Sequence, residues 1–390
     1  MAAGRFLDHA RPRALLESAL AAGELPPAFL FTGPHGVGKE EAALELAMAL
    51  NCMAAAPDPG LDLFTAPVGG SDEVPGTGTS GEDEPGSRLG GCRVCSNCDR
   101  IVRYAHPDVI VRLPLPRPKK KSGEPADPSE ALAWKATHPY RDPVIEGGNL
   151  TIGIADVRAE VKKLGMAPVE GGRRVIIFRE AEKMTDNAQN ALLKSLEEPP
   201  AHTLFVLTTD RPQSLLPTVL SRCRTLYFGP LAAPVIAGWL RDRGVASEHE
   251  HLPVLARGSL KRALAIAGGD IPGRQEALQL LQWAAAGERV RALRWAAEHT
   301  FRSGQGAQIH ARALLGELLS LLRDVAALQS GREDLQNPDR SDLLGSLATG
   351  IGAGRIEKAL AETLQASGEV DSFVNLALIY TGLYEAISPA

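Results

Sequence analysis

Short apolar runs alternate with helically spaced apolar positions over the first 230 residues. The runs that are long enough for buried or half-buried strands lie at residues 28–32, 108–112, 174–178, 203–208 and 225–228. Apolar residues recur every three to four positions at residues 10–22, 40–51, 154–164, 184–198 and 214–220. Strands that alternate with helices predict an α/β core with a parallel sheet and flanking helices.

The strand signal stops near residue 229, and only helical spacing follows. Residues 230–272 are expected to form a small helical unit, and residues 273–390 a longer helical bundle with Leu-rich faces. A Gly- and Pro-containing stretch at 268–273 separates them and is typical of a linker. We therefore expect three domains, at residues 1–229, 230–272 and 273–390.

Two segments interrupt the pattern of the core. Residues 56–90 are rich in Gly, Pro, Ser, Asp and Glu, and a second interruption covers 114–148. Segments with few large apolar residues do not bury enough surface to offset their ordering entropy, so flexible inserts are expected. A charged surface loop is the alternative for the first. The lysine triplet at 119–121 is either a solvated face or a nucleic-acid contact.

The composition is that of a globular, multidomain protein. The chain has 390 residues, of which 44% are hydrophobic and 23% charged, and its formal net charge is −5. This charge argues against non-specific nucleic-acid binding by the chain alone. It has neither an apolar run of about 18 residues nor the pattern of a secretory leader, so a cytoplasmic location is expected.

A glycine-rich loop follows the first apolar run and opens a helix. Gly33, Gly36, Gly38 and Lys39 match G-x-x-x-x-G-K-[ST], whose backbone N–H groups and Lys bind phosphates. The residue after the lysine, however, is Glu40 where a hydroxyl should bind Mg²⁺. Its carboxylate would oppose a phosphate about 4 Å away by around 4 kcal/mol at an effective dielectric of 20.

The second half of a nucleotide-hydrolysing site also departs from its pattern. An Asp at the end of a buried strand should help to hold Mg²⁺, followed by a Glu that polarises water. This chain has Arg179 and then Glu180. Both departures affect the same ion. The loop is therefore interpreted as a retained structural turn, with weak nucleotide binding and Mg²⁺-dependent hydrolysis through Lys39 and Glu180 as alternatives.

Three cysteines at three-residue spacing indicate a metal site. Cys92, Cys95 and Cys98 form a C-x-x-C-x-x-C knuckle, and Cys52 ends the helix after the phosphate loop. Four thiolates suit a closed, structural Zn²⁺ site that leaves no position open for catalysis. The alternative is a set of buried or free thiols, and the fourth ligand is the least secure because Cys52 lies far from the knuckle in sequence. Cys223 is expected to be a small buried residue.

Polar residues follow two of the predicted strands or helical turns. Thr208, Thr209 and Asp210 end a strand and would either sense a γ-phosphate or cap the strand. Ser221, Arg222 and Cys223 follow a helical turn, where Arg222 is either a surface residue or an arginine finger for a neighbouring subunit.

Together these motifs resemble those of the clamp-loader subunits of bacterial DNA polymerase III, which belong to the AAA+ class. The specific motifs are N-A-L-L-K-x-L-E-E-P-P at residues 190–200 and S-R-C at 221–223, in addition to the loop and the cysteine knuckle. The resemblance covers residues 5–229 apart from the two inserts, and residues 256–264 are similar to the lid helix of these proteins. It implies an AAA+ core, a helical lid and a helical collar that oligomerises the loader as a pentameric ring.

The resemblance also implies a role for individual residues. The tau/gamma ATPase of the group keeps a Ser or Thr after the loop lysine and an Asp-Glu pair, so this chain is more similar to the stator, which need not hydrolyse ATP. Arg222 would act as an arginine finger in trans on the ATP of an adjacent subunit. The implied partners are tau/gamma and delta, with the sliding clamp and primer-template DNA reached through the complex.

Two further functions are compatible with parts of the sequence. One is a tau/gamma-like subunit that hydrolyses ATP, and the other is a DNA-repair or recombination AAA+ protein whose inserts contact DNA. The resemblance favours the stator, as a component of a DNA-directed DNA polymerase holoenzyme without intrinsic ATPase activity.

Overall fold

The computed structural model describes residues 9–54, 89–116, 127–143, 145, 150–170, 172–245, 250–269, 271–300, 305–370 and 375–388. The chain divides into two compact units, Met1–Leu231 and Ala232–Ala390, here called the first and second units. The predicted insert at 56–90 lies almost entirely outside the described residues, as does the lysine triplet at 119–121. No helix in the described ranges is long and apolar enough to cross a membrane.

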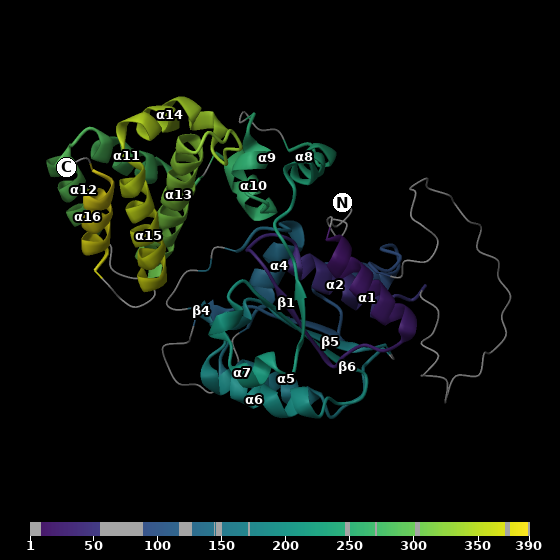
Figure 1. Ribbon diagram of the computed structural model, residues 1–390. Helices are drawn as coiled ribbons and strands as arrows, with labels where there is room; N and C mark the ends of the chain where they lie inside the picture. The colour runs from purple at the N-terminus through teal and green to yellow at the C-terminus, as the bar shows by residue number, and fades with distance from the viewer. Residues whose placement is uncertain are drawn as a thin grey trace, which may run out of the picture. The chain divides into compact units, whose positions relative to one another are not determined.

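A five-stranded parallel sheet forms the centre of the first unit and confirms the predicted α/β core (Figure 1). Its spatial order is β2-β5-β6-β1-β7. The strands are β1 (Ala28–Thr32), β2 (Val109–Arg112), β5 (Arg174–Phe178), β6 (Thr203–Thr209) and β7 (Arg224–Tyr227). Thr32 pairs with Thr209 on one side and Tyr227 on the other, so the carboxyl ends of three strands meet at one edge. Ligands of open parallel sheets bind at this kind of edge.

Alternate residues of the buried strands point to opposite faces of the sheet. Phe29 and Phe31 of β1 pack with helices α1 (Ala10–Ala22), α2 (Lys39–Asn51) and α3 (Ser96–Val102). Ala28 and Leu30 of the same strand pack with α5 (Ile154–Lys163), α6 (Asp186–Glu197) and α7 (Pro217–Leu220). Figure 1 shows these two helical layers on either side of the sheet. The inner strands β1, β5 and β6 are buried along their whole length and are mainly apolar because both faces are covered, whereas β7 at the edge is mostly exposed.

The second predicted insert is partly helical. Its ends are joined by a small antiparallel ribbon of β3 (Leu115–Pro116) and β4 (Leu150–Thr151). Within it, Ser129–Thr137 form helix α4. This differs from the expected flexible insert, and the reason lies in contacts with the phosphate loop that are described below. The predicted helix at 214–220 is also divided, into a 3-10 turn at Pro212–Ser214 and α7.

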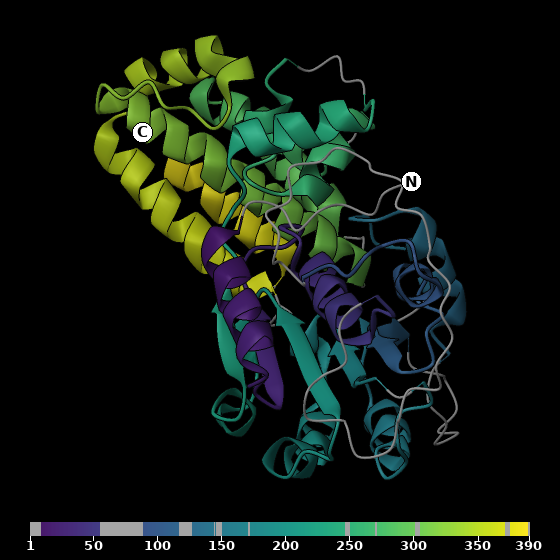
Figure 2. The same ribbon diagram turned by 90° about the vertical axis from the view of Figure 1, so that its right-hand side faces the viewer.

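The second unit consists of helices in its described residues, as Figure 2 shows in green to yellow. Its helices are α8 (Ala233–Asp242), α9 (Leu252–Leu255), α10 (Leu260–Ala267), α11 (Arg274–Ala285), α12 (Arg289–Thr300), α13 (Gln305–Gln329), α14 (Ser341–Gly350), α15 (Ala353–Glu369) and α16 (Leu376–Ile387), with a 3-10 turn at Pro338–Arg340. Leucines of α13 are fully buried at its centre, including Leu314, Leu318 and Leu322. Leu293, one of the apolar positions of the predicted bundle, is instead 36% exposed.

A buried carboxylate joins the predicted lid and collar segments of this unit. Glu317 of α13 is 2% exposed and lies 2.8 Å from Arg257, 2.5 Å from Arg262 and 3.3 Å from Arg274. Three guanidinium groups favour the charged carboxylate, so the pKa of Glu317 is lowered although burial acts in the opposite direction. The division of the second unit into lid and collar stays a prediction.

Candidate functional site

The phosphate loop is a tight turn between β1 and α2. Gly33 has φ +141° and Gly38 has φ +103°, a region of backbone conformation that side chains other than that of glycine rarely adopt. A Cβ at Gly33 would also lie 2.0 Å from the carbonyl oxygen of Phe228. Glycine at this position is therefore required by the packing of the loop against the chain after β7, whether or not a phosphate binds.

Lys39 is turned toward its own loop. Its Nζ donates hydrogen bonds to the carbonyl oxygens of Gly33, at 2.6 Å, and Pro34, at 2.7 Å. Burial lowers the pKa of Lys39, although the carboxylates of Asp210 and Glu182 oppose this effect. Two of the three ammonium donors are thus used within the protein.

Glu40 and Arg179 form a buried ion pair. Nε of Arg179 lies 2.9 Å from Oε2 of Glu40, and the two residues are 6% and 7% exposed. Lys135 of α4 lies 2.8 Å from the same oxygen, and the hydroxyl of Tyr104 donates to the other carboxylate oxygen at 2.9 Å. The two residues that replace the expected Mg²⁺ ligands are therefore bonded to each other.

The charges of this cluster are balanced inside the protein. Arg179 also donates to Asp142 at 2.8 Å, and His35 of the loop lies 3.2 Å from Asp142. Burial opposes the charge of Arg179, but Glu40 and Asp142 together raise its pKa above the ordinary value. Burial and the neighbouring Glu40 raise the pKa of Glu41 to about 7. The charged form of Arg179 is thus the stable one in this surrounding.

Two carboxyl groups lie close together at this edge of the sheet, that of Asp210 after β6 and that of Glu182 in the 3-10 turn (Ala181–Lys183) after β5. Burial and the neighbouring Asp210 raise the pKa of Glu182 to about 7, whereas the hydrogen bond from Glu182 lowers that of Asp210 despite burial. Thr209 is fully buried, and its hydroxyl oxygen accepts from the backbone N–H of Arg211 at 3.0 Å. Thr208 accepts from the N–H of Glu180 at 3.3 Å. Both hydroxyl oxygens thus accept hydrogen bonds from backbone N–H groups just beyond the ends of β5 and β6.

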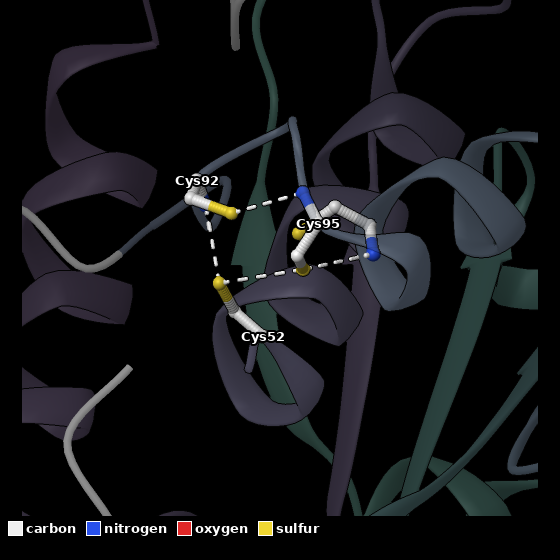
Figure 3. A group of neighbouring side chains, drawn as sticks. Cys52, Cys92 and Cys95 are labelled. Atoms are coloured by element: carbon white, nitrogen blue, oxygen red, sulfur yellow. Dashed lines mark hydrogen bonds between the residues drawn. The ribbon is translucent and has the colours of Figure 1, made fainter. Parts of the chain in front are cut away.

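Four cysteines meet beside α2 and α3. The sulfur atoms of Cys52, Cys92, Cys95 and Cys98 all lie within 4.8 Å of one another, and Cys52 and Cys95 are 4.0 Å apart. Figure 3 shows the side chains of Cys52, Cys92 and Cys95 turned toward one another. A tetrahedral site with metal–sulfur bonds of about 2.3 Å places its sulfurs about 3.8 Å apart. This group can hold a metal ion, and it includes Cys52, which lies far from the other three cysteines in sequence.

Backbone N–H groups donate hydrogen bonds to sulfur atoms of this group. The N–H of Cys92 donates to the sulfur of Cys52 at 3.2 Å, and the N–H of Cys95 donates to that of Cys92 at 3.3 Å. Burial opposes ionisation of Cys95, but the N–H groups of Cys98 and Met53 lower its pKa to about 6. A Cβ at Gly91 would lie 2.8 Å from the sulfur of Cys98, which explains the glycine next to the knuckle.

Cys223 lies apart from this group and is half-buried against the core under α6 and α7. Burial raises the pKa of its thiol to about 11. It is a packing residue rather than a member of the cluster of four.

Arg222 lies on the turn between α7 and β7. Its side chain is 32% exposed, forms an ion pair with Glu197 at the end of α6, and donates to the carbonyl oxygen of Thr218 at 2.8 Å. The residue is thus held by the N-A-L-L-K helix, while part of its guanidinium faces solvent.

Three residues that contact the Glu40–Arg179 pair are missing from the sequence prediction. Tyr104, Lys135 and Asp142 carry no motif, and the last two lie in the segment that the sequence describes as an insert. The available signal was that two opposite charges replace two ligands of the same ion, at positions 40 and 179. That signal is compatible with an ion pair between the two positions, but it does not identify the residues around them.

Similarity to known proteins agrees with these features. A family model described as "DNA polymerase III, delta subunit" matches residues 80–232. The DNA polymerase III subunit delta' of Escherichia coli is 33% identical over 258 residues, which cover 65% of this chain and 75% of that protein. The corresponding subunit of Bacillus subtilis is 26% identical over 330 residues, covering 84% and 80%.

Other matches are to related subunits. The DNA polymerase III subunit tau of Escherichia coli is 28% identical over 349 residues, which cover 83% of this chain and 43% of that protein. A solved DNA polymerase III gamma subunit-related protein of Thermotoga maritima is 17% identical, covers 95% of this chain and 98% of its own, and has a TM-score of 0.35. The identity and coverage of the Escherichia coli delta' protein are what decide the family: this chain belongs to the delta-prime family of DNA polymerase III subunits.

Proposed function

We propose that this chain acts as a delta-prime subunit in a DNA polymerase III clamp loader, where it is a stator that does not hydrolyse ATP. Its contribution to loading a sliding clamp onto primed DNA is structural, together with Arg222 supplied to the ATP site of a neighbouring subunit. The family assignment and the charge cluster at the phosphate loop support this role.

The ion pair between Glu40 and Arg179 is the observation that carries the proposal. Phosphate-loop NTPases hold Mg²⁺ with the hydroxyl after the loop lysine and with an Asp at the end of the neighbouring strand. Here both positions are occupied by side chains that bond to each other at 2.9 Å. A divalent cation would have to displace a guanidinium group from its buried carboxylate. The same observation disfavours the alternative of a tau/gamma-like ATPase.

The position of Arg222 supports its role toward a neighbour. A finger must be exposed, and it must be held by a rigid element so that it reaches the partner's phosphate in one geometry. Arg222 is partly exposed and follows α7, while α6 supplies Glu197 as its partner. In the isolated chain Glu197 neutralises the guanidinium, and a triphosphate of an adjacent subunit would compete for it.

We further propose that the cysteine cluster holds Zn²⁺ as a structural ion. Four sulfur ligands at these separations suit the closed tetrahedral geometry of Zn²⁺. Bound there, the ion would supply cross-links between the end of α2 and the knuckle before α3, and no chemistry. Cys52, Cys92, Cys95 and Cys98 fill every coordination position, so water has no access to the metal.

Reconstitution tests the proposed function. The chain should copurify with tau/gamma and delta subunits, and its own ATP hydrolysis should stay at the background level with Mg²⁺ present. Primer-template DNA and the sliding clamp should be engaged only by the assembled complex. Robust hydrolysis by the isolated chain that is lost in the Lys39→Ala variant would contradict the proposal and favour the ATPase alternative.

A further inference from the structure

Residues 127–143 lie between β3 and β4 in the sequence and contact the start of α2 and the phosphate loop. They contain α4 and the turn that follows it, and this part of the chain is called the cover segment here. Figure 1 shows α4 next to α2. A phosphate group can bind such a loop only if it can reach the N–H groups at the N-terminus of the following helix. In this chain, side chains of the cover segment contact residues at this place: Lys135 reaches Glu40 at the start of α2, and Asp142 reaches His35 of the loop.

Lys135 is the first anchor of the cover segment. It is 2% exposed, and its Nζ lies 2.8 Å from Glu40 and donates to the carbonyl oxygen of Arg141 at 3.1 Å. A buried ammonium group is costly unless it is paired, so this contact fixes α4 on the loop. Lys135 supplies one of the two cations, with Arg179, that neutralise Glu40.

Tyr140 and Asp142 form the second anchor. The ring of Tyr140 is buried, and its Cε1 lies 3.8 Å from the position that a Cβ at Gly38 would take. Asp142 lies 2.8 Å from Arg179 and 3.2 Å from His35 of the loop. The cover segment therefore contacts the loop histidine and the residue that replaces the metal-binding Asp, and it places the ring of Tyr140 next to Gly38.

We propose that the cover segment is an intramolecular plug that closes the degenerate phosphate loop against nucleotides. Its side chains take the place of the cation and phosphate groups that the loop would otherwise bind. The plug extends the non-hydrolysing role proposed above, and it assigns a function to the second insert. Loss of hydrolysis and loss of access are separate properties, so they can be tested separately.

The plug predicts how nucleotide affinity should change when it opens. When a binding-competent state is only fractionally populated, the apparent dissociation constant rises by the inverse of that fraction. A plug that is open for less than about a tenth of the time therefore weakens binding at least about tenfold. Opening the plug should therefore lower the apparent dissociation constant of the nucleotide by the same factor. This comparison requires that the repulsion by Glu40 is removed in both proteins.

The test compares two full-length variants with the same loop sequence. The first carries Glu40→Thr and Lys135→Met, so that the loop regains its hydroxyl and no unpaired lysine stays buried. The second adds Tyr140→Ala and Asp142→Ala, which remove the remaining anchors. Fluorescence titration with mant-ADP and Mg²⁺ should give at least about tenfold tighter binding to the second. Adding Glu130→Gln, an exposed position of α4, to the first should change nothing.

Equal affinities of the two variants would overturn the plug. Micromolar binding of mant-ADP by the unaltered chain would overturn the plug as well. The ATPase turnover of the assembled loader, by contrast, tests only the proposed function. If the second variant does not fold, hydrogen exchange of the unaltered chain tests the plug instead. Amides of residues 33–41 and 128–142 should then lose protection at the same urea concentration, and independent opening of the two segments would contradict the proposal.

Discussion

Removing Arg179 should strongly destabilise the first unit. At 2.9 Å and an effective dielectric of 20, its attraction to Glu40 amounts to about 6 kcal/mol, which is largely offset by desolvation of both groups. Arg179→Met leaves Glu40 buried with Lys135 and Tyr104 as partners, and it leaves Asp142 with His35. Breaking a buried pair in this way costs roughly 3–5 kcal/mol.

Native-state hydrogen exchange measures this cost with an internal reference. The opening free energy of β5 amides should fall by about 3–5 kcal/mol in Arg179→Met, while that of α13 in the second unit stays the same. Glu40→Gln should also destabilise β5, and the double variant should lose less than the sum of the two losses. Strictly additive losses, or a loss below about 1 kcal/mol in Arg179→Met, would refute the argument that the two residues act as a buried pair.

Three further outcomes are expected. Metal analysis should find about one Zn per chain, lost in a variant with Cys52→Ser and Cys95→Ser but retained in Cys223→Ser. Glu182→Gln should raise stability above pH 7 by about 1–3 kcal/mol and leave it unchanged below pH 4.5, because the pKa of Glu182 is raised to about 7 and its ionisation opposes folding in that window. A pH-independent effect on urea unfolding would contradict this. In the assembled loader, Glu197→Gln should preserve or increase ATPase turnover by releasing Arg222, and a loss as large as that of Arg222→Ala would argue against Glu197 as its competing partner.

The strands of the first unit could be predicted because their signal is local. Buried parallel strands are continuous apolar runs, and Ile176 and Ile177 are fully buried on opposite faces of the sheet as such a run requires. The spacing of apolar residues also indicates α1, α2, α5 and α6, but it does not predict α3 or α4. The strand order depends on long-range pairing, and apolar runs alone do not specify it.

The candidate site was only partly predictable, because its decisive contacts join distant parts of the chain. Motif spacing identifies Lys39 and the cysteine knuckle, and it marks Glu40 and Arg179 as departures. Their mutual ion pair appears only when β1 and β5 are placed in one sheet. Lys135 lies in a segment whose composition resembles that of an unstructured insert, and a lone lysine there carries no signal.

Arg222 is another residue that a motif identifies without predicting its contacts. The S-R-C motif indicates the residue, and the structure adds Glu197, which belongs to the other motif of the resemblance. Neither pattern predicts that the two motifs meet, because the contact is formed by the end of α6 and the turn after α7. The exposure of Arg222 and its pairing are therefore structural information.

ATPase turnover of the reconstituted clamp loader tests the central claim most directly. Loaders that contain Arg222→Ala should assemble as the unaltered complex does, but lose roughly 10³-fold or more of their clamp- and DNA-stimulated turnover if Arg222 completes a neighbour's site. Arg224→Ala, an exposed arginine two residues further along, is the matched control and should keep full turnover. Unchanged turnover with Arg222→Ala in a fully assembled loader would contradict the account.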